Sequence, residues 1–136
     1  MPRFPSAEWM QEFCERLEGE DDVEDVARAL DGVYRFVVEP AGPLHERHAY
    51  DVAIRPADGG AQAALLDGQV GQPRLVMTAN YQRWQQLIEG RLDVGMAIML
   101  RRLRVSGDLA RLIRDVNTVK PLMRALGDVE TQWLDE

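Results

Sequence analysis

Residues 75–108 have the sequence LVMTANYQRWQQLIEGRLDVGMAIMLRRLRVSGD. Both ends of this stretch are strand-like and its middle is helical. The run 74–78 is mainly apolar, as in a strand, and 102–106 alternates polar and apolar residues as a half-buried strand does. Between them, apolar residues recur at helical spacing at Tyr81, Trp84, Leu87 and Ile88. Gly90 is placed to end this helix, and Asp93 to begin a second, shorter one containing Met96, Ala97, Met99 and Leu100.

The chain before this stretch predicts two helices followed by strands. Ser6 can cap a first helix that ends at Gly19, and a second, short helix ends at Gly32. Three strands follow, at residues 33–39, 47–55 and 61–66. Because their connections are short, these strands should form an antiparallel meander. We therefore predict one α+β domain over 1–136, with helices covering one face of a five-stranded, mostly antiparallel sheet.

Two further helices are expected after the last strand. Gly107 and Asp108 can cap the first, and Pro121 begins or kinks the second. Their apolar residues are Leu109, Leu112, Ile113 and Val116 in the first, and Leu122, Met123 and Leu126 in the second. These helices would complete the layer that covers the sheet.

The composition is that of a globular protein with an acidic surface. The formal net charge is −7, which disfavours a nucleic-acid partner because such binders are usually basic. No apolar run reaches the roughly 18 residues that a membrane span needs, so stable membrane insertion is not expected. Residues 1–6 lack the apolar core of a secretion signal, so we expect a cytoplasmic protein.

The sequence offers few groups for catalysis or metal binding. Cys14 is the single cysteine, and His45 and His48 are the only histidines that could activate it. Two residues three apart in a strand point to opposite faces, which disfavours a metal shared by these histidines. Neither a glycine-rich phosphate loop nor a Gly-x-Ser-x-Gly elbow occurs. We therefore predict a protein that is not an enzyme and needs no metal or cofactor.

Two clusters have both a structural and a functional interpretation. Arg101, Arg102 and Arg104 form a basic cluster in this acidic chain. It is either an ordinary exposed surface or a contact for an anionic group such as a carboxylate, a phosphate, coenzyme A or a membrane surface. The many apolar residues of 75–105 either close into a core or enclose a ligand, and methionines suit varied apolar shapes. Periodicity does not separate these interpretations.

The same stretch resembles the sterol carrier protein 2 family. Residues 77–81, Trp84 and 87–93 match a family pattern of strand, short helix, and Gly-Lys-Leu followed by Asn or Asp. Residues 101–108, RRLRVSGD, resemble the family element Gly-[Lys/Arg]-Leu-x-[Val/Ile]-x-Gly-[Asp/Asn]. FPSAEW, at 4–9, is similar to stand-alone bacterial members.

The resemblance implies a five-stranded sheet covered by helices, with an apolar tunnel between the two layers. It implies non-catalytic binding or transfer of a fatty acid, fatty acyl-CoA, sterol-like or polyprenyl lipid. The matched positions implied to line the tunnel are Trp84, Leu87, Ile88, Leu92, Met96, Met99 and Leu103. Apolar periodicity adds Val105, Leu112, Met123 and Leu126 as further lipid contacts. Arg101, Arg102 and Arg104 would then contact an anionic head group.

The chain departs from the family pattern at two positions. The family often has glycine where this chain has Arg101, and proline where it has Val94. Arg101 stands where the short helix turns into the last strand. We expect it to alter the backbone there or to narrow the mouth of a tunnel.

A second hypothesis uses the same fold with a closed core. The domain would then mediate protein interaction or homodimerisation, or accompany an enzyme, through its C-terminal helix. Trp133 and Met123, near the end of the sequence, would form the exposed apolar patch that such an interface needs.

Overall fold

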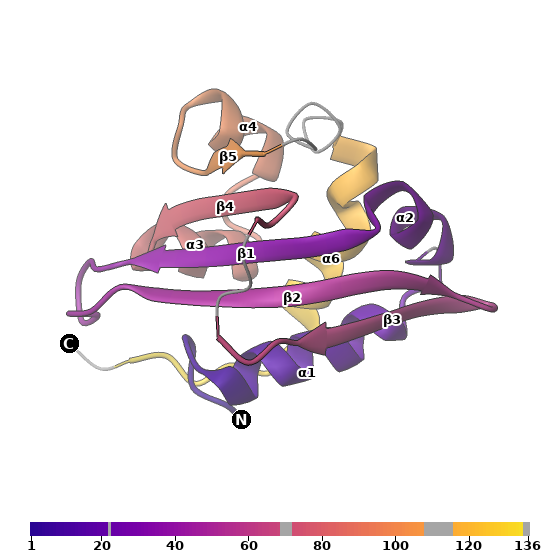
Figure 1. Ribbon diagram of the computed structural model, residues 1–136. Coiled ribbons are helices and arrows are strands. Elements are labelled where there is room, and N and C mark those ends of the chain that lie inside the picture. Colours follow the sequence, from indigo (N-terminus) through magenta and orange to yellow (C-terminus); the bar gives the residue numbers. More distant parts are fainter. Residues whose placement is uncertain (22, 69–71, 108–115, 135–136) are drawn as a thin grey trace.

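The computed structural model describes residues 1–21, 23–68, 72–107 and 116–134 (Figure 1). The elements are α1 (Ala7–Glu18), α2 (Val23–Leu30), β1 (Gly32–Glu39), β2 (His48–Ala57), β3 (Gly60–Leu65), β4 (Leu75–Asn80), α3 (Tyr81–Ile88), α4 (Val94–Met99), β5 (Arg104–Ser106) and α6 (Val116–Asp128). The expected order of helices and strands is therefore confirmed wherever the structure describes the chain. The helix predicted after Gly107, with Leu112, lies outside the described residues.

The five strands form one mixed sheet in the order β3-β2-β1-β4-β5. β1, β2 and β3 are the antiparallel meander that their short connections predict. β5 is antiparallel to β4, whereas β4 runs parallel to β1, since Tyr34 pairs with Leu75 and Glu39 with Asn80. The chain thus crosses from the outer strand β3 past β2 and β1 to β4 before it enters α3.

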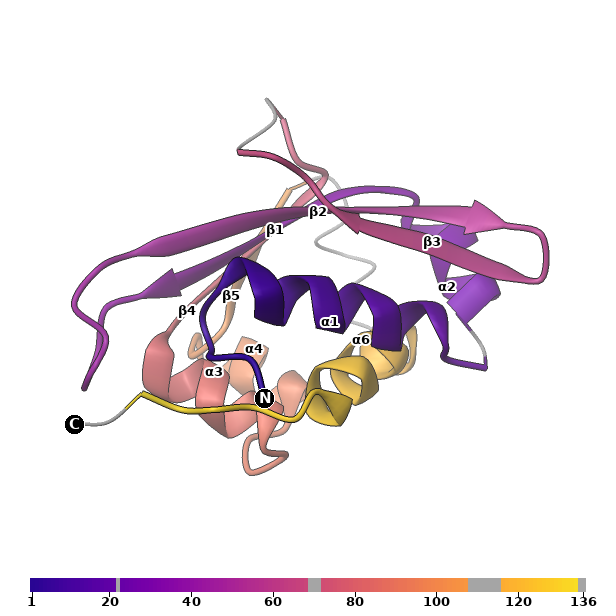
Figure 2. The same cartoon turned by 90° about the horizontal axis from the view of Figure 1, so that it is seen from below.

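The helices cover one face of this sheet, as Figure 2 shows. Alternate residues of β1 point toward them, and Tyr34, Phe36 and Val38 are buried in the core. α1 contributes a continuous buried face of Trp9, Met10, Phe13, Cys14 and Leu17. The predicted α+β architecture, with a helical layer on a five-stranded sheet, is confirmed.

Aromatic rings fill much of the space between the layers. The ring centroids of Phe4 and Trp9 lie 4.8 Å apart, and those of Trp9 and Phe13 lie 6.2 Å apart. Phe13 contacts Phe36 at 5.5 Å, and Phe36 contacts Trp84 at 6.0 Å. These distances are those of favourable aromatic pairs. The series links the N-terminal segment, the sheet and α3 into one core.

The two ends of the chain run side by side under the helical layer (Figure 2). The backbone N–H of Phe4 donates to the carbonyl of Gln132 at 3.1 Å. Trp133 is half-buried, and its ring lies 5.7 Å from Phe4 and 6.2 Å from Tyr81. The patch expected at the C-terminus therefore does not include an exposed Trp133.

Two elements differ from their sequence-based predictions. β5 begins at Arg104 and not at Arg102, because the backbone N–H groups of Arg102 and Leu103 both donate to the carbonyl of Ala97. A residue whose N–H closes the end of α4 has no donor left for the sheet. α6 begins before Pro121, so this proline lies inside the helix and does not start it.

Candidate functional site

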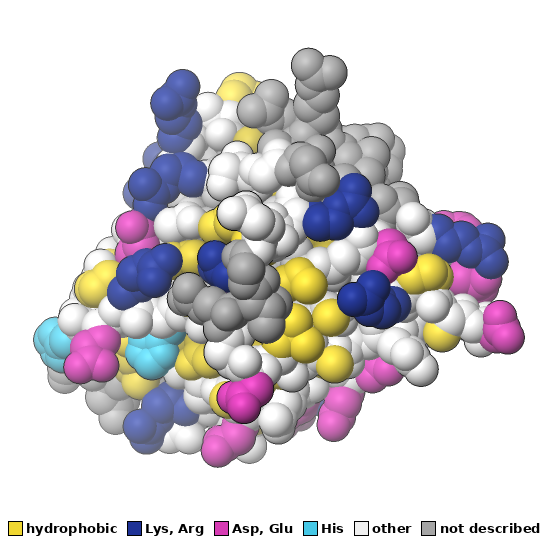
Figure 3. Space-filling view, in the orientation of Figure 1, with side chains coloured by type: hydrophobic (Ala, Val, Ile, Leu, Met, Phe, Trp, Pro, Cys, Tyr) yellow, Lys and Arg dark blue, Asp and Glu magenta, His cyan; other side chains and the backbone are white. Residues whose placement is uncertain are grey.

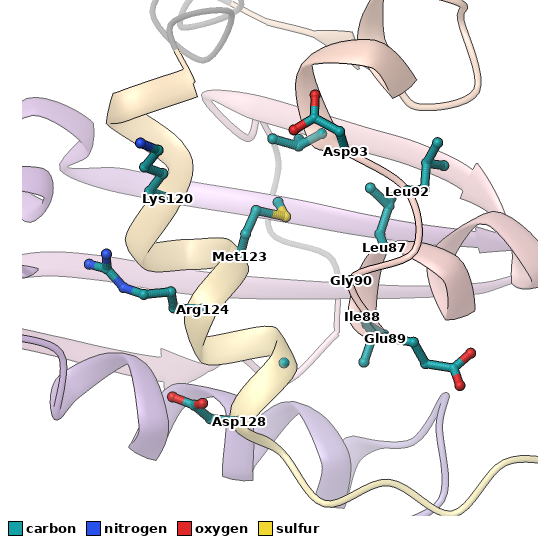
Figure 4. Close-up of a pocket in the computed structure, with 12 residues that line it drawn as sticks. Leu87, Ile88, Glu89, Gly90, Leu92, Asp93, Lys120, Met123, Arg124 and Asp128 are labelled. Carbon is teal, nitrogen blue, oxygen red and sulfur yellow. The ribbon is translucent and has the colours of Figure 1, made fainter.

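A groove of about 520 Å³ opens between α6 and the connection from α3 to α4 (Figure 4). One wall is formed by α6 and the other by the end of α3 and the start of α4. Its lining residues are Leu87, Ile88, Glu89, Gly90, Leu92, Asp93, Val94, Lys120, Met123, Arg124, Gly127 and Asp128. The groove thus lies between segments that are far apart in the sequence.

The floor of the groove is apolar. Leu87 and Ile88 are the last buried residues of α3, while Leu92 and Met123 are half-buried. Figure 4 shows the thioether of Met123 pointing from α6 toward the opposite wall, where Leu87 lies. Methionine and leucine together offer a flexible apolar surface that adapts to ligand shape.

The rim of the groove is charged. Lys120 and Arg124 come from α6, and their charged ends point away from the groove centre in Figure 4. The Nε of Arg124 donates to Glu20 at 3.1 Å. Asp93 accepts the backbone N–H of Met96 at 3.0 Å and so caps α4. An apolar floor inside a polar rim suits an amphipathic ligand.

A sharp helix end shapes the wall opposite α6. Gly90 has φ 77°, a left-handed conformation that glycine adopts without steric cost. The N–H of Arg91 donates to Gln86 at 2.9 Å and the N–H of Gly90 to Leu87 at 3.2 Å, the pair of bonds that defines a Schellman motif. The predicted role of Gly90 is confirmed, and the turn that follows carries Leu92 into the groove.

Between the sheet and the helices, the described residues enclose a small void of about 10 Å³. This volume admits about one water molecule. Its lining is Phe4, Trp9, Met10, Phe36, Val38, Tyr50, Trp84 and Leu126. Within the described ranges, the tunnel implied by the resemblance is therefore not open at this position, and the groove is the roomier apolar space.

The structure divides the predicted lipid contacts between groove and core. Four line the groove: Leu87, Ile88, Leu92 and Met123. Three are fully buried core residues: Trp84, Leu103 and Leu126. Val105 is half-buried on β5, where it pairs with Met77. Their contacts with a lipid stay predictions.

Met96 and Met99 lie on the surface. α4 buries Val94 and Ala97, which are three residues apart, so Met96 and Met99 point outward from the other side of this short helix. Periodicity marks both methionines as apolar but does not show which side of a six-residue helix is covered. In this structure neither methionine lines the groove.

The three predicted arginines line a second hollow, of about 370 Å³. Its lining is Glu39, Ala79, Asn80, Arg83, Arg101, Arg102 and Arg104. Arg104 forms an ion pair with Glu39. Arg83 was missed because it belongs to the predicted helix that starts at Asn80; only folding brings it beside the later arginines. The hollow has four guanidinium groups and one carboxylate, a composition that favours anions.

Cys14 is buried in α1 and is not an activated nucleophile. Burial raises the pKa of its thiol to about 12, and the nearby carboxylates of Glu18 and Glu15 contribute in the same direction. The thiol therefore stays protonated at neutral pH, and only a thiolate is strongly nucleophilic. Among the described residues no group of three or more His, Cys, Asp or Glu could hold a metal ion.

The five-stranded mixed sheet and the helices that cover one of its faces define a two-layer α+β domain. A family model, the SCP-2 sterol transfer family, matches residues 10–119. The chain belongs to this family, and membership supports lipid binding or transfer in general.

Solved structures of low sequence identity share the fold. A crystal structure of sterol carrier protein 2 is 22% identical, with a TM-score of 0.71, and the match covers 92% of this chain and 98% of that one. A conserved hypothetical protein from Thermus thermophilus is 22% identical, with a TM-score of 0.69 and coverage of 93% and 90%. The apo form of sterol carrier protein 2 from Yarrowia lipolytica is 11% identical, with a TM-score of 0.56 and coverage of 86% and 88%.

A comparison with curated proteins returns no match. In the described part of the chain, no helix has the length and apolar character to span a bilayer.

Proposed function

We propose that this protein binds the acyl chain of a lipid in the groove between α6 and the α3–α4 connection, and carries it without chemical conversion. The observation that carries the proposal is the apolar floor formed by Leu87, Leu92 and Met123 inside a charged rim. Membership of the SCP-2 sterol transfer family supports the ligand class. The buried, protonated thiol of Cys14 agrees with a role that uses no nucleophile.

The size and chemistry of the groove suit such a ligand. Its volume of about 520 Å³ lies within the range of small-molecule sites, roughly 300–1,000 Å³. Each methylene that leaves water contributes about 0.8 kcal/mol, so an acyl chain on this floor binds without any reactive group. Lys120 holds its charge at the outer rim, away from the apolar floor, where a carboxylate that extends beyond the floor would meet it. A linear chain fits an open groove because it can lie along the floor.

The test is binding of a fluorescent fatty acid to delipidated protein, with native mass spectrometry of the complex. Met123→Gln should weaken binding about fivefold, because the lost apolar contact is worth about 1 kcal/mol. Leu92→Gln should have a similar effect. Leu100→Gln is the matched control, since Leu100 is exposed and lies outside the groove.

Two results would contradict the proposal. If wild-type protein at micromolar concentration binds no fatty acid, the proposed function is wrong. If binding is unchanged by Met123→Gln but lost on Met99→Gln, the ligand lies in a tunnel past α4. The groove would then not be its binding site.

The small interior void favours one second candidate, an interaction domain with a closed core. The core is filled by rings such as those of Trp9, Phe36 and Trp84, and the groove would then receive an apolar helix of a partner or of a second copy. Sedimentation velocity separates the two functions. A stable dimer that is disrupted by Met123→Gln, together with no fatty-acid binding, would establish this second function.

A further inference from the structure

We propose that the end of α4 and the turn after it dock this protein on an anionic membrane surface. The docking surface consists of Met96, Met99, Leu100, Arg101 and Arg102. It adjoins the arginine hollow and combines exposed apolar side chains with positive charge. Neither feature depends on the groove.

The apolar part of the docking surface is concentrated on one short helix. In the described ranges, four large hydrophobic residues are exposed: Met1 at 76%, Met96 at 46%, Met99 at 71% and Leu100 at 50%. Three of the four fall within five positions at the end of α4. Clustered exposed apolar residues mark an interaction surface, whereas scattered ones do not.

The positive part follows directly in the sequence. The N–H of Arg102 donates to Ala97 at 2.8 Å and that of Arg101 to Ile98 at 3.1 Å, so α4 ends in a Schellman motif. Arg101 occupies its left-handed position with φ 60°. Both arginines are exposed, and they line one hollow with Arg83 and Arg104. Figure 3 shows basic side chains gathered at the upper left, over α4 and β5, with apolar side chains beside them.

Charge complementarity identifies the occupant as an anionic bilayer. Apolar side chains that enter the interface, together with cations that meet anionic head groups, are the combination that peripheral membrane proteins use. The chain as a whole carries a net charge of −7, so the rest of the molecule is on balance repelled by the same membrane. The protein would therefore bind in one orientation, with α4 toward the lipid.

This orientation places the groove beside the membrane. α4 has six residues and is about 9 Å long. Asp93 and Val94, at the start of α4, line the groove, while Met99 and Leu100 lie at the other end of this helix. A docked molecule can thus exchange lipid with the bilayer over a short distance. This consequence rests on the proposed function, whereas docking itself requires no ligand.

The experiment is co-sedimentation of the full chain with lipid vesicles. Vesicles of phosphatidylcholine mixed with phosphatidylglycerol should bind the protein, and binding should weaken as salt is raised. Vesicles of phosphatidylcholine alone should bind it far less. Arg101→Gln and Arg102→Gln should each weaken binding about fivefold, as expected for one arginine near an anionic surface. Met99→Gln combined with Leu100→Gln should also weaken it.

Matched variants control for the loss of a positive charge. Arg28→Gln and Arg55→Gln remove exposed arginines on α2 and β2. These variants should bind vesicles as the wild type does. The proposal is overturned if wild-type protein does not bind anionic vesicles, or if the control variants weaken binding as much as the docking-surface variants.

Fatty-acid binding in solution, measured in parallel on the wild type, separates this proposal from the proposed function. Fatty-acid binding without vesicle binding overturns docking alone. Vesicle binding without fatty-acid binding supports docking and contradicts the groove function. If the docking-surface variants keep vesicle binding but abolish self-association, the surface is a protein interface and docking is overturned.

Discussion

The indole nitrogen of Trp84 donates a hydrogen bond of 2.8 Å to the carbonyl oxygen of Val37 and so ties α3 to β1. Both residues are buried. Trp84→Phe keeps an aromatic ring but leaves this carbonyl without the indole donor. We expect a loss of about 1–3 kcal/mol in the free energy of unfolding, measured by urea denaturation. An unchanged urea midpoint would show that the bond contributes nothing to stability.

Arg35 and Asp51 face each other across β1 and β2, and the guanidinium contacts both carboxylate oxygens at 2.8 and 3.0 Å. The Asp51 side chain is fully buried. Arg35→Met breaks the ion pair of this buried carboxylate and should reduce the free energy of unfolding by about 3–5 kcal/mol. Arg16→Met, which breaks an exposed pair with Glu12, is the control and should change it by less than about 1 kcal/mol. Equal effects would contradict the role of burial.

Position 107 requires glycine for two reasons, its backbone conformation and the close approach of a neighbouring strand. Its φ is 117°, and a Cβ there would lie 2.3 Å from the carbonyl oxygen of Arg74. We expect Gly107→Ala to destabilise the protein by about 3 kcal/mol or more in thermal or urea unfolding. Gly59→Ala is the matched control, because Gly59 also has positive φ but has nothing within 4 Å of an added Cβ. This control variant should lose only about 1–2 kcal/mol.

Arg101 occupies a left-handed position that glycine favours. A residue with a Cβ pays about 1–2 kcal/mol for its φ of 60°, and glycine avoids this cost. Glycine in turn loses more conformational entropy on folding, which offsets part of the gain. Arg101→Gly should therefore leave the free energy of unfolding unchanged or raise it by up to about 1 kcal/mol. The same variant should weaken binding to anionic vesicles. A clear loss of stability would mean that the arginine side chain makes a stabilising contact.

The raised pKa of Cys14 predicts a loss of stability at high pH. Its pKa rises from an ordinary value of 9.0 to about 12 in the folded protein, so the folded state keeps a proton that the unfolded state releases. This contribution is complete below about pH 9 and is lost as the pH rises toward 12, with a slope of up to about 1.4 kcal/mol per pH unit. Burial also raises the pKa values of Tyr50 and Tyr81, with the same sign.

The measurement is therefore a difference between the wild type and Cys14→Ala. The free energy of unfolding should fall less steeply for Cys14→Ala between pH 9 and 12. Parallel curves would contradict the assignment. In addition, a thiol reagent at about pH 8 should label Cys14 only as fast as the folded protein opens.

Local signals predicted the secondary structure well. Ser6 and Asp93 cap their helices through the backbone N–H groups of Trp9 and Met96, and Gly90 ends α3 as expected. Each of these features depends on groups within about four residues, so the sequence alone contains the information. The short links between the first three strands fixed their antiparallel order for the same reason.

The tertiary structure decided which apolar residues form a site. Trp84, Leu103 and Met99 share the same apolar character, yet the first two are buried and Met99 is exposed. Likewise, Arg83 meets the later arginines only because β4 lies next to β5. Helical periodicity gives the face of a residue relative to its own helix. Whether that face is covered depends on contacts between distant segments, and these contacts made Met123 part of a groove and left the end of α4 exposed to solvent.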